Sequence, residues 1–324
     1  MDAGHIYVPL VGGRVDCLDR ETGALVWSAE PGGIITASPA VDGKSVYIVT
    51  RKISEDGAEA GGSLRAVDSE TGLTLWVQNF ARPFSSAVEV GSARLYASSA
   101  DGSFCALSAT SGEIVWKVDT PDLVRGQALA TEHAVYFGCD DGVLRAVEPD
   151  SGKLIWKFQT TGRIVCKPSV DDRRLYFGSG DGFVYAIESG TGRLSWRSRT
   201  GAAVEATPVL LGARVFVASF DNFIYALTKA HGDRIWKRRL ENRIVAEPIV
   251  SGDAIMIAPL QGEAAVVFLH ADGRRVNFIQ LEQGFKIVAE PILSGDLLLM
   301  ATNKGLVAAR ATHPIDNRAN AVKK

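Results

Sequence analysis

Two stretches of the chain share one pattern: AVEPDSGKLIW at residues 146–156 and AIESGTGRLSW at residues 186–196. Further copies of this frame end at Trp27, Trp76, Trp116 and Trp236, and a degenerate copy ends at Phe278. From Trp76 to Trp236 the tryptophans return every 40 residues. A fixed period of this length indicates one supersecondary unit that is copied and stacked.

Within each unit the sequence alternates with period two, which predicts short strands rather than helices. Asp-Gly pairs at Asp101, Asp141 and Asp181 separate adjacent runs, and this pair favours tight hairpin turns. Four strands fit each unit; in one copy they are an inner strand at residues 164–170, a second at 174–177, a third at 183–188 and an outer one around 194–196. Four-stranded antiparallel units of this length predict an all-β fold, the β-propeller.

The count of second and third strands favours eight blades. A seven-bladed alternative would leave the hydrophobic runs 297–301 and 306–310 without a place. The first unit begins at its second strand and the last stops after its third, so we expect both end blades to be incomplete. A segment upstream of Met1 would supply the two missing strands, close the ring and carry a secretion signal. We expect residues 1–310 to form the propeller and the polar residues 311–324 to form a disordered tail.

The repeated glycine and tryptophan have a structural explanation. A glycine such as Gly152 permits the tight turn into the outer strand, and the tryptophan four residues later covers the gap between neighbouring blades. Rings spaced around a circle cannot converge on one small molecule. We therefore expect structural docking roles for Trp27, Trp76, Trp116, Trp156, Trp196 and Trp236.

The phrase Ala-x-Asp-x-x-Thr-Gly-x-x-x-Trp at residues 66–76 resembles the tryptophan-docking motif of the pyrroloquinoline quinone (PQQ)-like propeller repeats. The resemblance spans residues 5–310. The PQQ-dependent alcohol and glucose dehydrogenases of this superfamily use a longer chain, a catalytic aspartate, a calcium site and, in many alcohol dehydrogenases, a disulfide between adjacent cysteines. This chain has no adjacent cysteines and its Asp-Gly pairs are explained by turns, so we expect no quinone, no other cofactor and no enzyme activity.

The composition narrows the classes of partner. The net charge of −2 does not favour nucleic acid, and no apolar run has the length of a membrane helix. The four cysteines (Cys17, Cys105, Cys139, Cys166) and five histidines (His5, His133, His231, His270, His313) are scattered without the spacing of metal ligands. We therefore predict no metal site and no catalytic nucleophile.

The inner strands are expected to line a central channel. At the position before the usual proline they carry Ser38, Ser86, Gln127, Lys167, Thr207, Glu247 and Glu290. We take the charged members, Lys167, Glu247 and Glu290, as channel-lining residues. Four positions earlier stand Ile34, Arg82, Leu123, Arg163, Ala203, Arg243 and Lys286. Arg82, Arg163, Arg243 and Lys286 predict a basic channel mouth, which either is merely solvated or attracts an acidic side chain or small anionic ligand.

One unit carries an insertion, RKISEDGAEAGG at residues 51–62, between its second and third strands. We expect it to lie on the same face as the basic mouth. Such a loop is either tolerated slack or a site where function is grafted onto a repeat. Its charged residues Arg51, Lys52, Glu55 and Asp56 are our candidates for contact with a partner.

The chain is also similar to the BamB-type propeller subunits of the outer-membrane β-barrel assembly machinery. These eight-bladed PQQ-like lipoproteins dock on the periplasmic domains of the barrel-forming subunit through blade-connecting loops. The resemblance implies a monomeric, non-catalytic protein-protein interaction scaffold of the bacterial cell envelope, in the periplasm if an upstream signal was removed and otherwise in the cytoplasm. The chain has no lipid-attachment cysteine near its N-terminus, so a membrane-tethered role is an analogy. The alternatives are a ligand-binding or sensor propeller and a quinoprotein-like enzyme.

Overall fold

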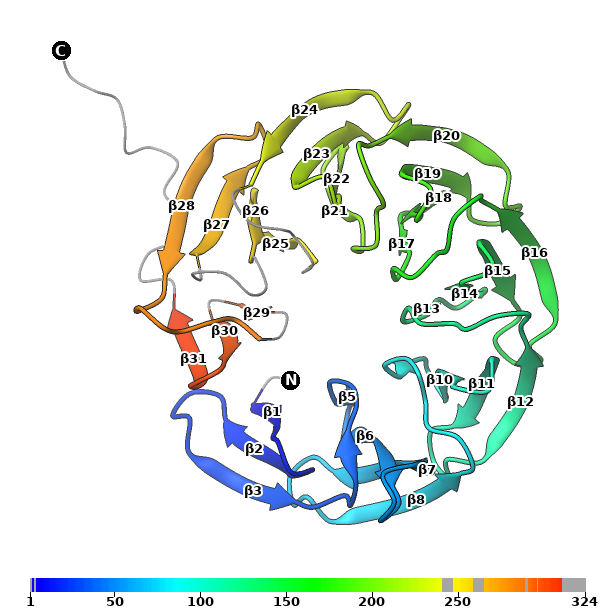
Figure 1. The fold of residues 1–324 in the computed structure, drawn as a ribbon, viewed down its shortest axis with the longest axis vertical. Coiled ribbons are helices and arrows are strands. Elements are labelled where there is room, and N and C mark those ends of the chain that lie inside the picture. The colour runs from blue at the N-terminus through cyan, green and yellow to red at the C-terminus, as the bar shows by residue number, and fades with distance from the viewer. Residues whose placement is uncertain are drawn as a thin grey trace.

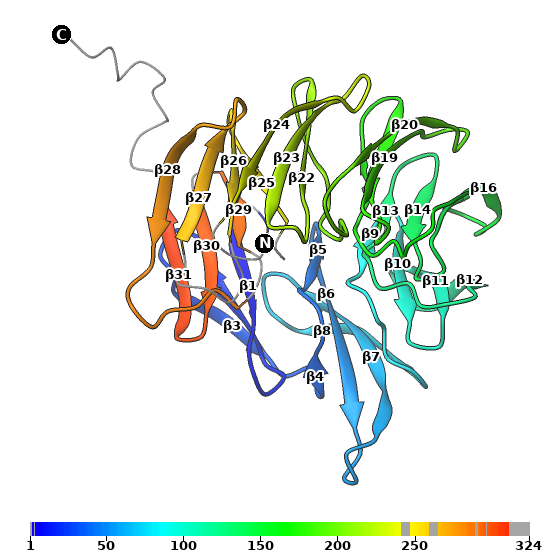
Figure 2. The ribbon, with the colours of Figure 1, turned by 45° about the horizontal axis from the view of Figure 1, so that its top comes forward.

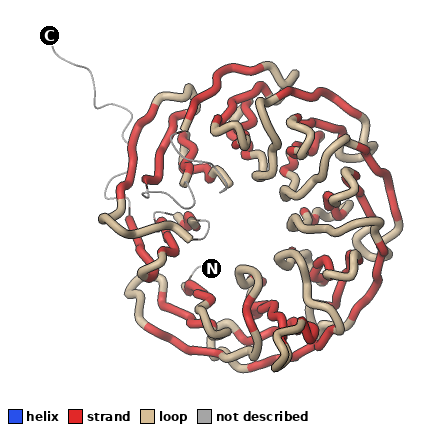
Figure 3. The backbone as a smooth tube through the Cα atoms, in the orientation of Figure 1, coloured by secondary structure: helices blue, strands red, loops and turns tan. Residues whose placement is uncertain are grey.

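Eight antiparallel sheets follow one another around a ring (Figure 1). The structure is a computed structural model that describes residues 2, 4–240, 247–258, 265–288, 291–295 and 297–310. In these residues the regular structure is entirely β, without helix (Figure 3). The predicted all-β, eight-bladed β-propeller is confirmed, and the seven-bladed alternative is wrong. The predicted tail, residues 311–324, lies outside the described residues.

Five blades have the expected four strands, which run in chain order from the inner edge of the ring to the outer edge. Blade 3 contains β9 (Glu89–Val90), β10 (Arg94–Ser99), β11 (Ser103–Ser108) and β12 (Ile114–Asp119). Blade 4 contains β13 (Leu129–Ala130), β14 (Val135–Gly138), β15 (Val143–Val147) and β16 (Leu154–Gln159). Blade 5 contains β17 (Ser169–Val170), β18 (Arg174–Gly178), β19 (Phe183–Glu188) and β20 (Leu194–Arg199). Blade 6 contains β21 (Val209–Leu211), β22 (Arg214–Ala218), β23 (Phe223–Thr228) and β24 (Arg234–Arg239). Blade 7 contains β25 (Ile249–Ser251), β26 (Ala254–Ile257), β27 (Ala265–His270) and β28 (Arg275–Gln280).

The predicted second and third strands of blade 5 agree with β18 and β19, whereas the inner strand is shorter than expected. Residues 164–170 were predicted to be extended throughout, but only β17 at their end is a strand. The reason is that the Ile164 amide donates to the Cys139 carbonyl of blade 4, at 3.0 Å. This part of the segment connects two blades instead of pairing within one.

The first and last blades are three-stranded in the described residues. Blade 1 contains β1 (His5–Pro9), β2 (Val15–Asp19) and β3 (Leu25–Ala29), and blade 8 contains β29 (Ile292–Ser294), β30 (Leu297–Thr302) and β31 (Gly305–Arg310). The positions without a strand are the inner one of blade 1 and the outer one of blade 8, as the sequence predicted. That an upstream segment fills them stays a prediction.

Blade 2 differs from the others in its second and third strands. It contains β4 (Ile34–Ile35), β5 (Ala40–Asp42), β6 (Ser45–Ile53), β7 (Glu59–Asp68) and β8 (Thr74–Phe80). The insertion is therefore not a loop, because β6 and β7 continue their pairing through Arg51↔Gly62 and, after a bulge, Ile53↔Glu59. Figure 2 shows this hairpin projecting beyond the ring.

The seams from blade 1 through blade 7 carry a repeated contact made by tryptophan. In blade 4, the Trp156 indole Nε1 donates to the Ser189 carbonyl of blade 5 at 3.0 Å. The ring also packs on Gly192, where an added Cβ would lie 2.7 Å from the Trp156 Cε3. Equivalent hydrogen bonds of 2.9–3.1 Å join Trp27 to Ser69, Trp76 to Ala109, Trp116 to Pro149, Trp196 to Lys229 and Trp236 to Ala271. All six indoles thus join a blade to the next one.

The glycine of the motif meets two requirements at once. Gly192 has a φ of 70°, a backbone conformation that favours glycine, and its bare face touches the tryptophan of the preceding blade. The glycine and the tryptophan of one motif therefore serve different seams. The tryptophan is supported within its own blade by Tyr136, whose ring centroid lies 5.7 Å from that of Trp156.

Candidate functional site

The inner strands of three consecutive blades are joined by polar side chains. The Lys167 ammonium lies 2.7 Å from the Glu89 carboxylate, and the Gln127 amide donates to the same carboxylate oxygen at 3.0 Å. The Glu89 side chain is 12 % exposed and that of Lys167 is 27 % exposed. The predicted channel-lining residue Lys167 is therefore held in a network that connects blade 5 to blade 3.

Glu89 was missed as a site residue, although the sequence carries a signal for it. It stands three positions after Ser86 on the inner strand of blade 3. The equivalent positions in the other units hold Val41, Ala130, Val170, Leu210, Val250 and Leu293. A single carboxylate in an apolar column needs a cation to offset its burial, and Lys167 supplies it.

Of the other two predicted channel-lining residues, only Glu247 is described by the structure. The Thr207 hydroxyl of blade 6 donates to the Glu247 carboxylate, which lies just before β25 in blade 7. This is a second polar link between neighbouring inner strands. Glu290 lies outside the described residues.

The predicted basic mouth is partly neutralised. The Arg163 guanidinium lies 2.6 Å from the Glu205 carboxylate, and this bonding raises the pKa of Arg163. The Glu205 side chain, at the seam between blades 5 and 6, is only 18 % exposed. The charge of Arg163 therefore offsets the cost of burying this carboxylate. Arg82 and Lys286 are exposed, whereas Arg243 lies outside the described residues. The mouth as a binding site for an anion stays a prediction.

The projecting hairpin carries the four residues predicted to contact a partner. Arg51 and Glu55 are exposed, and the Lys52 ammonium donates to the Asn79 side chain of β8 at 2.8 Å. The Asp56 carboxylate accepts from the Ser54 hydroxyl and from the Ala58 amide, which lowers its pKa. Asp56 therefore shapes the turn of the hairpin.

Two glycines in the insertion fix the base of the hairpin. Gly61 has a φ of 99°, and an added Cβ there would strike the Phe80 carbonyl. A Cβ on Gly62 would lie 2.7 Å from the Pro83 Cα and from the Thr50 carbonyl oxygen. Because the backbones approach this closely, the glycine-rich composition of the insertion is explained by close packing and not by a loose loop.

Apolar side chains are exposed beside the hairpin. Ile53 near its tip is 46 % exposed, and Ile34 on the neighbouring strand β4 is 44 % exposed. Val11, in the turn between β1 and β2, is fully exposed. The turn of Val11 is adjacent, because Gly13 and Gly33 are in backbone contact. Exposed apolar side chains next to charged ones are typical of protein interaction surfaces.

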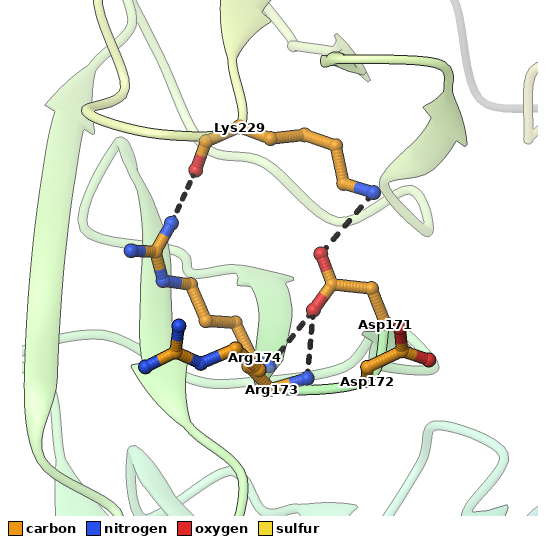
Figure 4. Close-up of a pocket in the computed structure, with 5 residues that line it drawn as sticks. All are labelled: Asp171, Asp172, Arg173, Arg174 and Lys229. Carbon is orange, nitrogen blue, oxygen red and sulfur yellow. Dashed lines mark hydrogen bonds and ion pairs between the residues drawn. The ribbon is translucent and has the colours of Figure 1, made fainter.

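A cavity of about 260 Å³ lies on the opposite face, where blade 5 meets blade 6 (Figure 4). It is lined by Asp171, Asp172, Arg173, Arg174 and Lys229. The Lys229 ammonium lies 3.1 Å from the Asp171 carboxylate, and Arg174 donates to the Lys229 carbonyl at 2.8 Å. That carbonyl also accepts from Trp196, so these polar groups belong to the seam.

We expect Asp171 to make stability depend on pH. Its burial raises the pKa, but hydrogen bonds from the Arg173 and Arg174 amides, the Tyr176 hydroxyl and Lys229 outweigh this and lower the pKa from 3.8 to about 2. A lowered pKa stabilises the fold fully above about pH 4, and this contribution, about 1–2 kcal/mol after solvent screening, is lost as the pH falls towards 2. Denaturation midpoints between pH 5 and 2 should fall less steeply for Asp171→Asn than for wild type. Equal slopes would contradict this role.

The described residues contain no group of three or more His, Cys, Asp or Glu that could hold a metal ion. All four cysteines are buried and unpaired with one another. The described part of the chain also has no helix that is long and apolar enough to cross a membrane.

A comparison with models of protein families identifies the family of the chain. The profile of the family described as outer membrane protein assembly factor BamB matches residues 1–78, 60–163 and 140–317. The chain belongs to this family. The predicted PQQ-like recognition is thereby confirmed. A search of curated proteins finds no match.

Solved structures share the fold of this BamB-family chain. BamB from Moraxella catarrhalis superposes with a TM-score of 0.81 at 21% identity, over 95% of this chain and 93% of that one. The computationally designed Ika8 protein has a TM-score of 0.81 at 13% identity, over 96% and 94% of the two chains. A europium-containing methanol dehydrogenase has a TM-score of 0.77 at 13% identity, over 93% and 81%. At these identities the likeness concerns the fold alone.

Proposed function

We propose that this BamB-family chain is a non-catalytic scaffold of the bacterial cell envelope that binds a protein partner in outer-membrane assembly. The observation that carries the proposal is the hairpin of β6 and β7, which projects beyond the ring (Figure 2). Its base is fixed by close backbone contacts, and its end presents Ile53 and Glu55 to solvent, while Arg51 is exposed nearer the base. Such a surface places a partner without moving the blades.

The polar links of the inner strands favour a scaffold over a sensor of small anions. Lys167 is bound to Glu89, and Arg163 is bound to Glu205. These cations already have carboxylate partners, so a free anion would have to displace them at a cost. The inner strands therefore serve first to join the blades.

The partner proposed from the family is the barrel-forming subunit of the assembly machinery, bound through its periplasmic domains. The experiment measures binding of these purified domains to immobilised wild-type chain by biolayer interferometry. The same domains are then tested against a variant in which Asp-Gly replaces residues 53–60 of the hairpin, so that Lys52 and Gly61 at its base are kept.

We expect this shortened variant to bind at least tenfold more weakly while its unfolding free energy changes by less than about 1 kcal/mol, because the removed tip is exposed. The matched control is Glu132→Ala with His133→Ala, an exposed pair in the turn between β13 and β14 on the opposite face, which should bind as wild type. Equal binding by the shortened variant would reject the hairpin as the docking site. No binding by wild type, together with dye reduction on addition of quinone and calcium, would replace the scaffold by an enzyme.

A further inference from the structure

The outer strands of blades 5 and 6 form a basic stretch of the rim, although the net charge of the whole chain is −2. Six exposed cations lie on these two strands, and neither strand contains an acidic residue. Each of the other described outer strands carries at most one cation. The six, which we call the basic rim, are Arg197 and Arg199 of β20 and Arg234, Lys237, Arg238 and Arg239 of β24.

Carboxylates do not neutralise the basic rim. In the part of the chain that the structure describes, none of its six cations forms an ion pair with a carboxylate. The Arg197 guanidinium lies 4.9 Å from the centre of the Phe183 ring, and the Lys237 ammonium lies 4.5 Å from that of Phe223. These rings position the two cations and leave their charge in place. The basic rim therefore attracts anions from solution.

The two strands of the basic rim lie next to each other. β20 and β24 follow one another along the outer edge of the ring (Figure 1). Their blades are joined at this seam by the hydrogen bond from the Trp196 indole to the Lys229 carbonyl. A flat surface can therefore touch both strands at once. The hairpin of β6 and β7 belongs to blade 2, on the other side of the ring, and stays free in such a contact.

The side chains of β20 and β24 suit the phosphate groups of a lipid surface. Five of the six cations are arginines, whose planar guanidinium pairs with phosphate through two hydrogen bonds. Leu194 and Ile235 of the same strands are 47 % and 43 % exposed. Apolar side chains beside cations are stabilised where lipid headgroups meet acyl chains. A nucleic-acid backbone or an acidic peptide offers no comparable apolar layer.

We propose that the basic rim binds the surface of an anionic lipid bilayer. Its arginines pair with lipid phosphates, and Leu194 and Ile235 enter the boundary between headgroups and acyl chains. The ring then stands on its edge, with its central channel parallel to the membrane plane. This contact is separate from the hairpin proposed to bind a protein partner, so either surface can be removed without the other.

The test measures sedimentation of the full chain with lipid vesicles. Vesicles of equal parts phosphatidylglycerol and phosphatidylcholine should bind the chain at least tenfold more tightly than vesicles of phosphatidylcholine alone. Added sodium chloride should weaken this binding, because salt screens exposed charges. The variant in which the hairpin is shortened should bind the vesicles as wild type does.

The protein variant combines Arg199→Gln, Arg238→Gln and Arg239→Gln, and it should bind the anionic vesicles at least tenfold more weakly than wild type. The matched control combines Arg14→Gln, Lys44→Gln and Lys304→Gln, which removes the same number of exposed charges from blades 1, 2 and 8. The control should bind as wild type does. Circular dichroism checks that both variants fold.

A second pair of changes tests the apolar part of the contact. Leu194→Ser with Ile235→Ser should weaken binding to anionic vesicles and leave the binding of polyglutamate and duplex DNA unchanged. Equal losses for the two triple variants would overturn the proposal, because only total charge would then matter. Absent vesicle binding, or tighter binding of polyglutamate or duplex DNA that the basic-rim variant abolishes, would also overturn it in favour of an acidic protein or a nucleic acid.

Discussion

Replacing Trp156 by alanine is expected to lower the free energy of unfolding by about 3–5 kcal/mol, the range for removing a buried aromatic side chain. Trp156 is 9 % exposed and packs in the core shared by blades 4 and 5. The substitution removes the indole from the Gly192 turn and leaves the Ser189 carbonyl without its donor. Guanidinium denaturation followed by circular dichroism measures the loss.

Two further variants separate the parts of this effect. Trp156→Phe keeps an aromatic ring on the turn but removes the Nε1 donor, so a loss of about 1–2 kcal/mol is expected. Ile155→Ala changes the neighbouring residue of β16, which is 44 % exposed, and should cost less than about 1 kcal/mol. If Trp156→Ala cost no more than Ile155→Ala, the indole would not hold the seam.

The second large effect is expected for Gly192→Ala. The added methyl group would lie 2.7 Å from the Trp156 ring, and the residue would keep a φ of 70°. The backbone conformation costs about 1 kcal/mol, and the collision adds about 1–3 kcal/mol because the Trp156 ring also packs against Tyr136. A total loss of about 2–4 kcal/mol in the same denaturation experiment is expected.

Gly212→Ala is the matched control for the collision. Gly212 has a φ of 55°, but an added Cβ there would meet nothing within 4 Å. It should therefore show the backbone cost alone, about 1 kcal/mol. Equal losses for Gly192→Ala and Gly212→Ala would mean that the turn, and not the contact with tryptophan, requires glycine.

The fold could be predicted because the same sequence pattern, and with it the same local structure, recurs along the chain. Trp76 to Trp236 set the period, and Asp181-Gly182 marked a turn in which Gly182 has a φ of 81°. The equivalent turn of the next repeat has Asp221-Asn222 instead of Asp-Gly, and Asn222 takes the same backbone conformation, with a φ of 66°. Local signals of this kind depend on neighbours in sequence, so they can be read without the structure.

The links between blades could not be predicted in the same way. Lys167 and Glu89 belong to units two blades apart, and only the depth of each inner strand brings them together. The insertion at residues 51–62 was predicted to be a glycine-rich loop, and glycine has a low strand propensity. The composition of the insertion does not indicate two tertiary contacts, which are the pairing of Arg51 with Gly62 and the close approach of Pro83 to Gly62.

In the repeated motif the glycine contacts the preceding blade and the tryptophan contacts the following one, and this affects how the number of blades can change in evolution. Trp156 contacts Gly192, and Trp196 contacts Gly232, so each seam joins residues of two successive copies. Deleting or duplicating 40 residues, wherever the cut falls between Trp76 and Gly232, again puts a tryptophan before a matching glycine. Gene rearrangements can therefore change the number of blades without creating a mismatched seam. The angle at which the two ends of the ring meet, rather than the chemistry of any seam, then selects the blade number.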